Sequence, residues 1–357
     1  MPFFDRDKMT FYPLKERNSK VTINEAAVSE DTWDQAISPS LEEKAECIAA
    51  EIIRARKKDA AVICAFGAHA IKNGLGRLLG EMLEKGWFTH LASNGAAVIH
   101  DWEFAFLGKS SEDVRANTAE GRFGAWEETG FYINLALAIG AFKGLGYSNS
   151  VGRMICDNGL FIPNREDLRS SVSAAGLDLC ELVEILDIPS GFLSIPHSYS
   201  ACSLLAAAVN TGRPFTCHPM FGHDIIYTHK ANRGAVIGRT AEKDFLEYVS
   251  GVSGLENGVY LSVGSAVMSP MIFEKALSMA RNAAGGKDTI RNCGIHVVDL
   301  QEASWNWARG EPPADNPAYY LRFMKTFNRM GCRADYYSAD NRDFFVSLYR
   351  SLKKKAP

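Results

Sequence analysis

The chain has 357 residues, of which 46% are hydrophobic and 23% charged, and its formal net charge is -3. This composition is typical of a globular protein, and it excludes binding of nucleic acid through an excess of basic residues. The start of the chain lacks the apolar core of a signal peptide, and no apolar run reaches the ~18 residues of a membrane span. We therefore expect a cytoplasmic protein that binds neither nucleic acid nor membranes.

The cysteines are scattered along the chain and form no Cys-x-x-Cys pair. Most lie in apolar surroundings, where a thiol behaves as a small hydrophobic group. The sequence therefore predicts neither a disulfide framework nor a zinc–thiolate site.

Residues 1–45 are polar, include Pro13 and Pro39 and show little periodicity, which predicts an N-terminal arm outside the core. A helix follows from Leu41, and the continuous apolar run at 60–66 is typical of a strand buried on both faces of a parallel sheet. A turn at Gly67, a helix to about residue 83 and a strand at 88–93 complete a first βαβ unit.

The segment 108–195 interrupts this alternation, and we expect it to form a helical insertion beside the sheet. The later elements are predicted at 200–210 (helix), 215–217 (strand), 242–252 (helix), 258–263 (strand), 269–281 (helix), 294–300 (strand), 334–338 (strand) and 343–352 (helix). This order predicts an α/β fold, Rossmann-like, with helices flanking a mostly parallel sheet. Residues 46–357 would form a single large domain.

The turns that follow the predicted strands contain small or polar residues. Ligands of doubly wound sheets bind beyond the carboxyl ends of the strands, where glycine permits close approach and helix N–H groups attract phosphate. The predicted cofactor-binding residues are Gly67, His69, Asn94, Gly95, Ala96, Gly264, Ser265, Asp299 and Asp340. The alternative is that these residues are ordinary helix caps and turns.

Two His-Asp pairs are the candidates for catalysis. His100-Asp101 follows the turn at 94–96, and His223-Asp224 lies in a histidine-rich segment at 218–229. The histidine spacing there does not fit a metal site, so we expect a polar pocket wall without metal. Asp224 would hold a substrate cation, and His100 or His223 would transfer a proton. Capping and core hydrogen bonds are the alternative role for each residue.

Aromatic residues gather in a proline-containing stretch at 305–320. Indole and phenol faces suit an alkyl-ammonium substrate through cation–π contacts, whereas a contact between subunits is equally compatible with such a loop. The predicted substrate-binding residues are His218, Trp305, Trp307, Tyr320 and Arg322.

Five segments, at 68–74, 93–101, 219–226, 262–267 and 339–342, are similar in order and spacing to motifs of deoxyhypusine synthase. That family has a Thr-Ala-Gly-Gly-like turn followed by Glu-Asp, where this chain has Ser93-Asn94-Gly95-Ala96-Ala97 followed by His100-Asp101. Its Gly-Asp-Met-Ile segment is similar to His223-Asp224-Ile225-Ile226, and its Leu-Gly-Gly-Gly-Val-Val turn to 262–267. The resemblance runs from about residue 60 to the C-terminus.

The resemblance implies a Rossmann-like fold, bound NAD and a homotetramer with active sites at dimer interfaces. In that family NAD takes hydride from spermidine, and a lysine in a Trp-Gly-Lys motif captures the aminobutyl group as an imine. Here the stretch 313–322 contains no lysine, and Arg322 stands at about that place. Because arginine does not form imines at neutral pH, we do not expect the lysine step.

We therefore expect an NAD-dependent transferase or oxidoreductase, similar to deoxyhypusine synthase, that acts on a small amine or polyamine as a dimer or tetramer. One alternative is a non-redox enzyme that uses His-Asp acid/base chemistry on the same fold. The other is a nucleotide-binding protein without catalytic activity.

Overall fold

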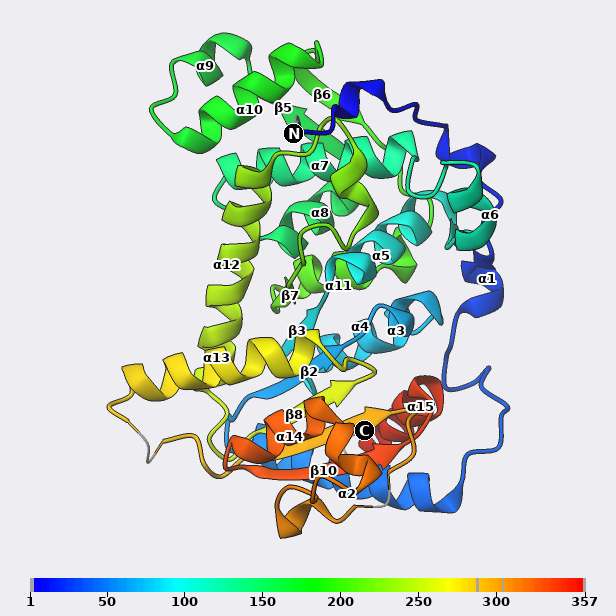
Figure 1. Ribbon diagram of the computed structural model, residues 1–357, viewed down its shortest axis with the longest axis vertical. Coiled ribbons are helices and arrows are strands. Elements are labelled where there is room, and N and C mark those ends of the chain that lie inside the picture. Colours follow the sequence, from blue (N-terminus) through cyan, green and yellow to red (C-terminus); the bar gives the residue numbers. More distant parts are fainter. Residues whose placement is uncertain (1–2, 287–288, 304, 356–357) are drawn as a thin grey trace.

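The computed structural model describes residues 3–286, 289–303 and 305–355 (Figure 1). Within these residues the main sheet has six strands in the order β10-β9-β8-β2-β3-β7, and every neighbouring pair is parallel. The predicted α/β fold is confirmed. The strands are β1 (Val21–Thr22), β2 (Val62–Phe66), β3 (His90–Ser93), β4 (Lys109–Ser110), β5 (Gly159–Ile162), β6 (Gly191–Ser194), β7 (Phe215–Cys217), β8 (Val259–Val263), β9 (Gly294–Asp299) and β10 (Arg333–Ser338).

The chain enters the main sheet at its centre. It forms β2, adds β3 and β7 on one side, and then crosses back to add β8, β9 and β10 on the other side. This is the 3-2-1-4-5-6 order of dinucleotide-binding folds, in which the direction of winding reverses between the two central strands. Here the reversal lies between β2 and β8.

The helices lie between and beyond these strands, and none that the structure describes is long and apolar enough to cross a membrane. The α-helices are α1 (Ile23–Ala26), α2 (Pro39–Lys57), α3 (His69–Lys72), α4 (Gly76–Glu84), α5 (Gly95–Leu107), α6 (Val114–Ala119), α7 (Glu127–Phe142), α8 (Tyr147–Cys156), α9 (Arg165–Arg169), α10 (Ala174–Ile185), α11 (Leu204–Thr211), α12 (Gly234–Ser253), α13 (Met268–Ala283), α14 (Arg322–Arg329) and α15 (Asn341–Lys355). Short 3-10 helices are η1 (Arg6–Lys8), η2 (Leu14–Glu16), η3 (Ser200–Cys202), η4 (Ile225–Thr228), η5 (Trp307–Arg309) and η6 (Pro317–Tyr320).

Helices cover both faces of the sheet and divide the core into two layers. On one face α2 and α15 pack together and against the sheet, and on the other face α12, α13 and α14 do so (Figure 1). Alternate residues of β2 pack into the two layers. Cys64 lies in the first layer, and Ile63 and Ala65 lie in the second. This two-sided burial explains why the apolar run at 60–66 is continuous rather than alternating.

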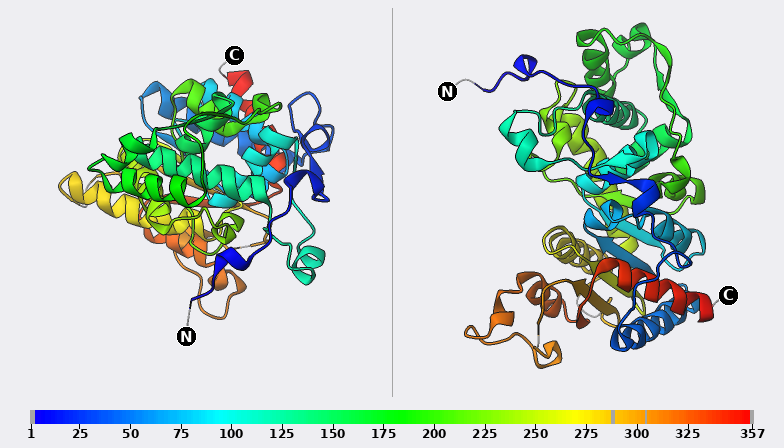
Figure 2. Two further views of the ribbon diagram at one scale, coloured as in Figure 1. Left: turned by 90° about the horizontal axis from the view of Figure 1, so that it is seen from above. Right: turned by 90° about the vertical axis from the view of Figure 1, so that its right-hand side faces the viewer.

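The segment between α5 and α11 adds helices beyond the β7 edge of the sheet. Helix α8 packs against β7, α5 and α11, and α7 packs on α8. Strands β5 and β6 form a separate antiparallel pair, which lies with α9 and α10 at one end of the molecule (Figures 1 and 2).

The N-terminal residues run along one side of the molecule, from the helical end to α2 (Figures 1 and 2). The expectation that they lie outside the core is wrong, because Leu14, Ile23 and Val28 are buried in the first layer. Strand β1 also pairs with β4 in antiparallel fashion. The buried residues of this arm are too widely spaced to produce a periodic pattern, so the sequence gives no sign of their burial.

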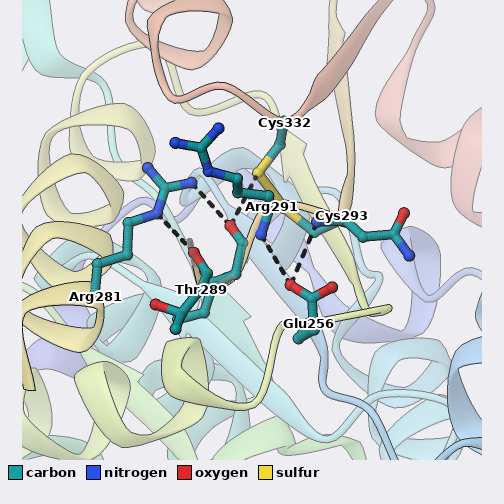
Figure 3. Close-up of a disulfide and its surroundings, with 8 residues drawn as sticks. Glu256, Arg281, Thr289, Arg291, Cys293 and Cys332 are labelled. Atoms are coloured by element: carbon teal, nitrogen blue, oxygen red, sulfur yellow. Dashed lines mark hydrogen bonds between the residues drawn. A yellow bond between two sulfur atoms is a disulfide. The ribbon is translucent and has the colours of Figure 1, made fainter. Parts of the chain in front are cut away.

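Cys293 and Cys332 form a disulfide, which corrects the expectation that the scattered cysteines provide no disulfide framework (Figure 3). They directly precede β9 and β10, whose register pairs Gly294 with Arg333, and the two Cα atoms lie 5.6 Å apart. Arg281 donates to the carbonyl oxygen of Ile290 at 2.8 Å and holds the adjoining loop. The pairing follows from the register of two separate strands, which cysteine spacing alone does not reveal.

Candidate functional site

The turns that the sequence singled out lie at one edge of the sheet. Because the strands of the main sheet are parallel, their carboxyl ends point the same way, and Gly67, Asn94, Gly264, Asp299 and Asp340 follow or end these strands. The fold therefore brings the predicted cofactor residues of β2, β3, β8, β9 and β10 to a common edge, as in other doubly wound sheets.

At the reversal of winding, the turns after β2 and β8 touch through their backbones. Gly67 N–H donates to the carbonyl of Val263 at 3.0 Å, and Gly264 N–H donates to that of Val298 at 2.8 Å. A Cβ atom at Gly67 would overlap the carbonyl oxygen of Gly264. Gly264 has a φ of 58°, in the left-handed region, and open space around its Cα. Gly264 is exposed and therefore presents backbone without a side chain, a surface that a pyrophosphate can approach closely, whereas Gly67 is buried against it.

Other predicted cofactor residues have local structural contacts. The side chain of Asn94 caps α5 by accepting from Ala97 N–H at 3.1 Å, and Ser265 Oγ accepts from Ser269 N–H at 3.2 Å. Asp340 accepts from Arg342 N–H at 2.8 Å and forms an ion pair with the Arg342 side chain. Asp299, which is half-buried at the end of β9, accepts from Gln301 N–H at 3.2 Å. His69 is exposed at the start of α3.

A cavity of about 230 Å³ lies beside the start of α5. Its wall combines residues of α5 with the N-terminal arm, α3, the segment between β4 and α7, and the residues that precede η4. The lining residues are Arg17, Lys72, Ala96, Ile99, His100, Glu103, Ser111, Glu112, Val114, Phe123, His223, Asp224 and Ile225. The predicted catalytic residues His100, His223 and Asp224 therefore meet at one cavity, His223 on the exposed side.

His100 begins a chain of hydrogen bonds that ends on a buried ion pair. Its Nδ1 lies 2.7 Å from Ser110 Oγ, and Ser110 donates to Glu103 Oε2 at 2.6 Å. Glu103 also accepts from the two terminal nitrogens of Arg17 at 2.7 and 2.8 Å and from Thr129 Oγ1 at 3.0 Å. We call His100, Ser110, Glu103 and Arg17 the relay.

The relay determines which nitrogen of His100 carries the proton. An ionised carboxylate only accepts hydrogen bonds, so the Ser110 hydroxyl proton points to Glu103 and Ser110 accepts from His100 Nδ1–H. Burial lowers the pKa of His100 to about 4; Glu103 opposes this effect, whereas the charges of Lys72 and Arg17 add to it. At neutral pH His100 is therefore uncharged, and its Nε2 is a proton acceptor.

Asp224 is the second polar group of the cavity wall, and it is buried. Its Oδ2 makes no hydrogen bond with any residue that the structure describes. Burial raises the pKa of Asp224 to about 6, and Tyr227, His223 and the N–H of Ala96 offset only part of this effect. The carboxylate lies against Gly95, where a Cβ atom would overlap Oδ2. Gly95 and Ala96 at the start of α5 were predicted to bind a cofactor phosphate. In the structure they lie against the carboxylate of Asp224, which would repel a phosphate.

Asp101 does not share the cavity with His100. Its carboxylate accepts from Ser203 Oγ at 2.6 Å and from Leu204 and Leu205 N–H at 2.8 and 3.1 Å, and so caps α11. Adjacent residues of a helix project about 100° apart, so a neighbouring His and Asp on α5 face different partners. The capping alternative describes Asp101 correctly, and its assignment as catalytic is corrected.

The predicted substrate-binding residues lie away from the cavity wall. His218 is buried between Thr216 Oγ1, at 3.0 Å, and the ring of Tyr248. Trp305 donates to the carbonyl of Gly310 at 2.8 Å, Trp307 is buried in the second layer, and Tyr320 is 69% exposed. The segment that carries Trp305, Trp307 and Tyr320 lies beside β10, at the end of the molecule remote from α5 and α6 (Figure 1). The side chain of Arg322 lies outside the described residues.

Several residues of the site were not predicted from the sequence. Glu103 lies one helical turn after His100 on α5, a spacing that places both on one face. Ser110, Arg17 and Lys72 come from other elements, and their isolated positions in the sequence carry no comparable signal. Among the described residues no group of His, Cys, Asp and Glu is arranged to hold a metal ion.

No protein-family model matches the chain, and no curated protein matches it. Among solved structures, it is similar to AgrE in a ternary complex with ornithine and NAD+ (16% identity, TM-score 0.47, covering 90% of this chain and 34% of that chain). It is also similar to ArgZ, a cyanobacterial arginine dihydrolase (14% identity, TM-score 0.42, covering 88% and 33%). A LOR/SDH protein from Methanococcus maripaludis S2 has 15% identity and a TM-score of 0.45, covering 92% and 73%. The chain thus spans about a third of the length of AgrE and ArgZ.

Proposed function

We propose that this protein is an NAD-dependent enzyme that oxidises a small amine bound in the cavity beside α5. The observation that carries the proposal is the strand order, because dinucleotides bind where the winding of such sheets reverses. Ala96 of the cavity wall lies on the first turn of α5, the helix that follows β3, and β3 is adjacent to β2. We therefore place the ligand of the cavity near a cofactor bound at the reversal.

The residues at the reversal fit a dinucleotide. The turn at Gly264 exposes backbone without a side chain, with Gly67 packed against it, and this is where we place the pyrophosphate. Asp299 ends the neighbouring strand β9 and is half-buried, a position from which a carboxylate can accept from ribose hydroxyls. Ser265 and Asp340 border the same region, in the turns that follow β8 and β10.

The residues of the cavity supply binding and proton transfer. Asp224, ionised above pH of about 6, would hold the ammonium group of the substrate. Nε2 of His100 would accept the proton that the ammonium must lose before its nitrogen lone pair can assist loss of hydride. When bound, NAD+ would supply the hydride acceptor.

The proposed reaction balances in atoms and charge. The ammonium group of the substrate would give one proton to His100, and bound NAD+ would supply the acceptor for the hydride that the carbon bearing the nitrogen loses. The substrate leaves as an iminium ion, in which a carbon–nitrogen double bond has replaced the single bond. The proton then passes from His100 to solvent, which its low pKa favours. Ser110 and Glu103 keep Nε2 unprotonated between turnovers.

Binding of the cofactor is the direct test. We expect purified protein to carry NAD detectable by mass spectrometry, or to show a thermal shift with NAD+ that ATP does not reproduce. Asp299→Ala should weaken NAD+ binding roughly tenfold, as expected for loss of hydrogen bonds to a carboxylate. Asp315→Ala, at an exposed position, is the matched control and should bind normally. Absence of binding of any nicotinamide dinucleotide would overturn the proposal.

The relay favours one alternative, a non-redox enzyme on the same fold. A histidine whose Nδ1 proton is held by a serine–glutamate pair can activate water without a cofactor. Turnover of a hydrolysable substrate without NAD, abolished in His100→Ala, would support this alternative over the oxidation.

A further inference from the structure

The acidic residues of the cavity differ in whether their oxygens already have partners. Both carboxylate oxygens of Glu103 accept hydrogen bonds, from Arg17, Ser110 and Thr129. Glu112 accepts from Asn117 Nδ2 at 2.6 Å, from Trp126 Nε1 at 3.0 Å and from Gly124 N–H at 3.3 Å. Only Asp224, among the described residues of this wall, has a buried carboxylate oxygen without a hydrogen bond.

The basic residues of the cavity also differ in whether their charged groups already have partners. Arg17 is bound to Glu103, with both side chains 1% exposed. Lys72 is half-buried at the end of α3, and its ammonium group has neither an ion pair nor a hydrogen bond with the residues that the structure describes. The cavity therefore has one available carboxylate and one available ammonium group.

The wall between these two charges is apolar. Ile99 and Ile225 contribute from α5 and η4, and Val114 and Phe123 contribute from the segment that carries α6. Val114 and Phe123 are 56% and 41% exposed, so much of each apolar side chain is accessible to a ligand. An alkyl segment is the complementary chemistry for this part of the wall.

We infer that the cavity binds a small amino acid whose ammonium group contacts Asp224, whose carboxylate contacts Lys72 and whose alkyl part lies against Ile99, Val114 and Phe123. This inference rests on the proposed function for the role of Asp224 and names the substrate class of the same site. Both charges of such a ligand are paired on binding, the ammonium group with the Asp224 carboxylate of the cavity wall and the carboxylate with Lys72.

Three probes of equal carbon length test the charge arrangement. Cadaverine has two ammonium groups, 5-aminopentanoate has one ammonium and one carboxylate, and glutarate has two carboxylates. At pH 8, isothermal titration should show that 5-aminopentanoate binds most tightly to the wild-type protein. Lys72→Met should weaken 5-aminopentanoate roughly tenfold to hundredfold, the range for a hydrogen bond to a charged group, and should remove its advantage over cadaverine.

Matched variants identify what each result means. Lys57→Met, at an exposed position on α2, should leave all affinities unchanged, and Asp224→Asn should weaken both amines but not glutarate. If cadaverine binds best to the wild type, the inference is wrong while the proposed amine oxidation stands. If Lys72→Met weakens NAD+ alone to the same degree, Lys72 belongs to the cofactor site and the inference is also overturned.

Discussion

At the scale of single residues, Asp224 shows how a binding group can lower stability. Its carboxyl is buried, one oxygen lacks a hydrogen bond among the described residues, and burial raises its pKa to about 6. The ionised form that would bind a cation is therefore disfavoured in the folded protein without ligand. Under the proposed function, Asp224 would serve to bind a cation rather than to stabilise the fold.

Asp224→Asn should therefore stabilise the protein at neutral pH. The folded pKa is raised, so the stability that protonated Asp224 contributes is complete below pH 3.8 and is lost as the pH rises through about 6. At 1.36 kcal/mol per pH unit, the variant should gain up to about 3 kcal/mol at pH 8 and little at pH 4. Urea unfolding at both pH values measures this. A variant less stable than wild type at pH 8 would show that the carboxylate is stabilised by its surroundings.

The tautomer of His100 gives a second test at this scale. Ser110→Ala removes the acceptor of Nδ1–H, so a larger share of His100 should carry its proton on Nε2. Nitrogen-15 NMR of labelled histidine reports this directly, and the turnover number should fall roughly a hundredfold, the lower end of the range for general acid–base catalysis. Ser110→Thr keeps the hydroxyl and should restore both readouts. Unchanged histidine shifts in Ser110→Ala would contradict the relay.

At the scale of elements, the helices around the site are fixed by buried side-chain caps. Asp101 on α5 satisfies N–H groups at the start of α11, and Asp244 on α12 accepts from Ser148 N–H and Cys217 N–H. Each cap joins two elements distant in sequence, so capping contributes here to tertiary structure as well as to the helix end.

Removal of the Asp101 cap should weaken α11 without removing ligand binding. Asp101→Ala leaves two backbone N–H groups and the Ser203 hydroxyl without their acceptor. We expect a loss of about 2–3 kcal/mol in unfolding free energy, and faster hydrogen exchange in α11. Asp101→Asn, which keeps one acceptor oxygen, should lose less. Loss of ligand binding in folded Asp101→Ala would show that the residue belongs to the site after all.

At the scale of the whole molecule, the N-terminal arm is part of the site rather than an appendage. Arg17 of this arm forms an ion pair with Glu103 on α5 and so neutralises the buried carboxylate of the relay. Removal of one partner of a fully buried ion pair lowers the stability of the folded protein strongly, because the other charge is then buried without a partner.

Arg17→Met should therefore cost about 3–5 kcal/mol of unfolding free energy. The double variant Arg17→Met/Glu103→Gln removes both charges and should recover most of this loss, as measured by denaturant unfolding of both variants and of Glu103→Gln. If the double variant is as unstable as Arg17→Met, the lost stability comes from packing of the arm and not from the unpaired carboxylate.

The sequence predicts the elements of the sheet better than the site between them. A continuous apolar run marks β2 because both faces of the sheet are covered, and this pattern is local. Strand order, the Cys293–Cys332 pairing and the meeting of His100 with Asp224 depend on contacts between distant segments. His100 and Asp224 were singled out because they follow strands, and both line the cavity, whereas Asp101 caps α11 because adjacent helix residues project in different directions. Arg17 was missed because a polar arm gives no periodic signal.

The contact between the turns at Gly67 and Gly264 also determines which substitutions the protein tolerates. Position 67 requires glycine for lack of space, since any side chain would push β2 away from β8. Position 264 requires glycine only for its left-handed backbone, and asparagine adopts that conformation readily. A saturation library selected for folded protein should therefore keep glycine alone at 67 but both glycine and asparagine at 264. Two glycines in direct contact would then tolerate different substitutions, because steric overlap restricts position 67 and the backbone torsion angle restricts position 264.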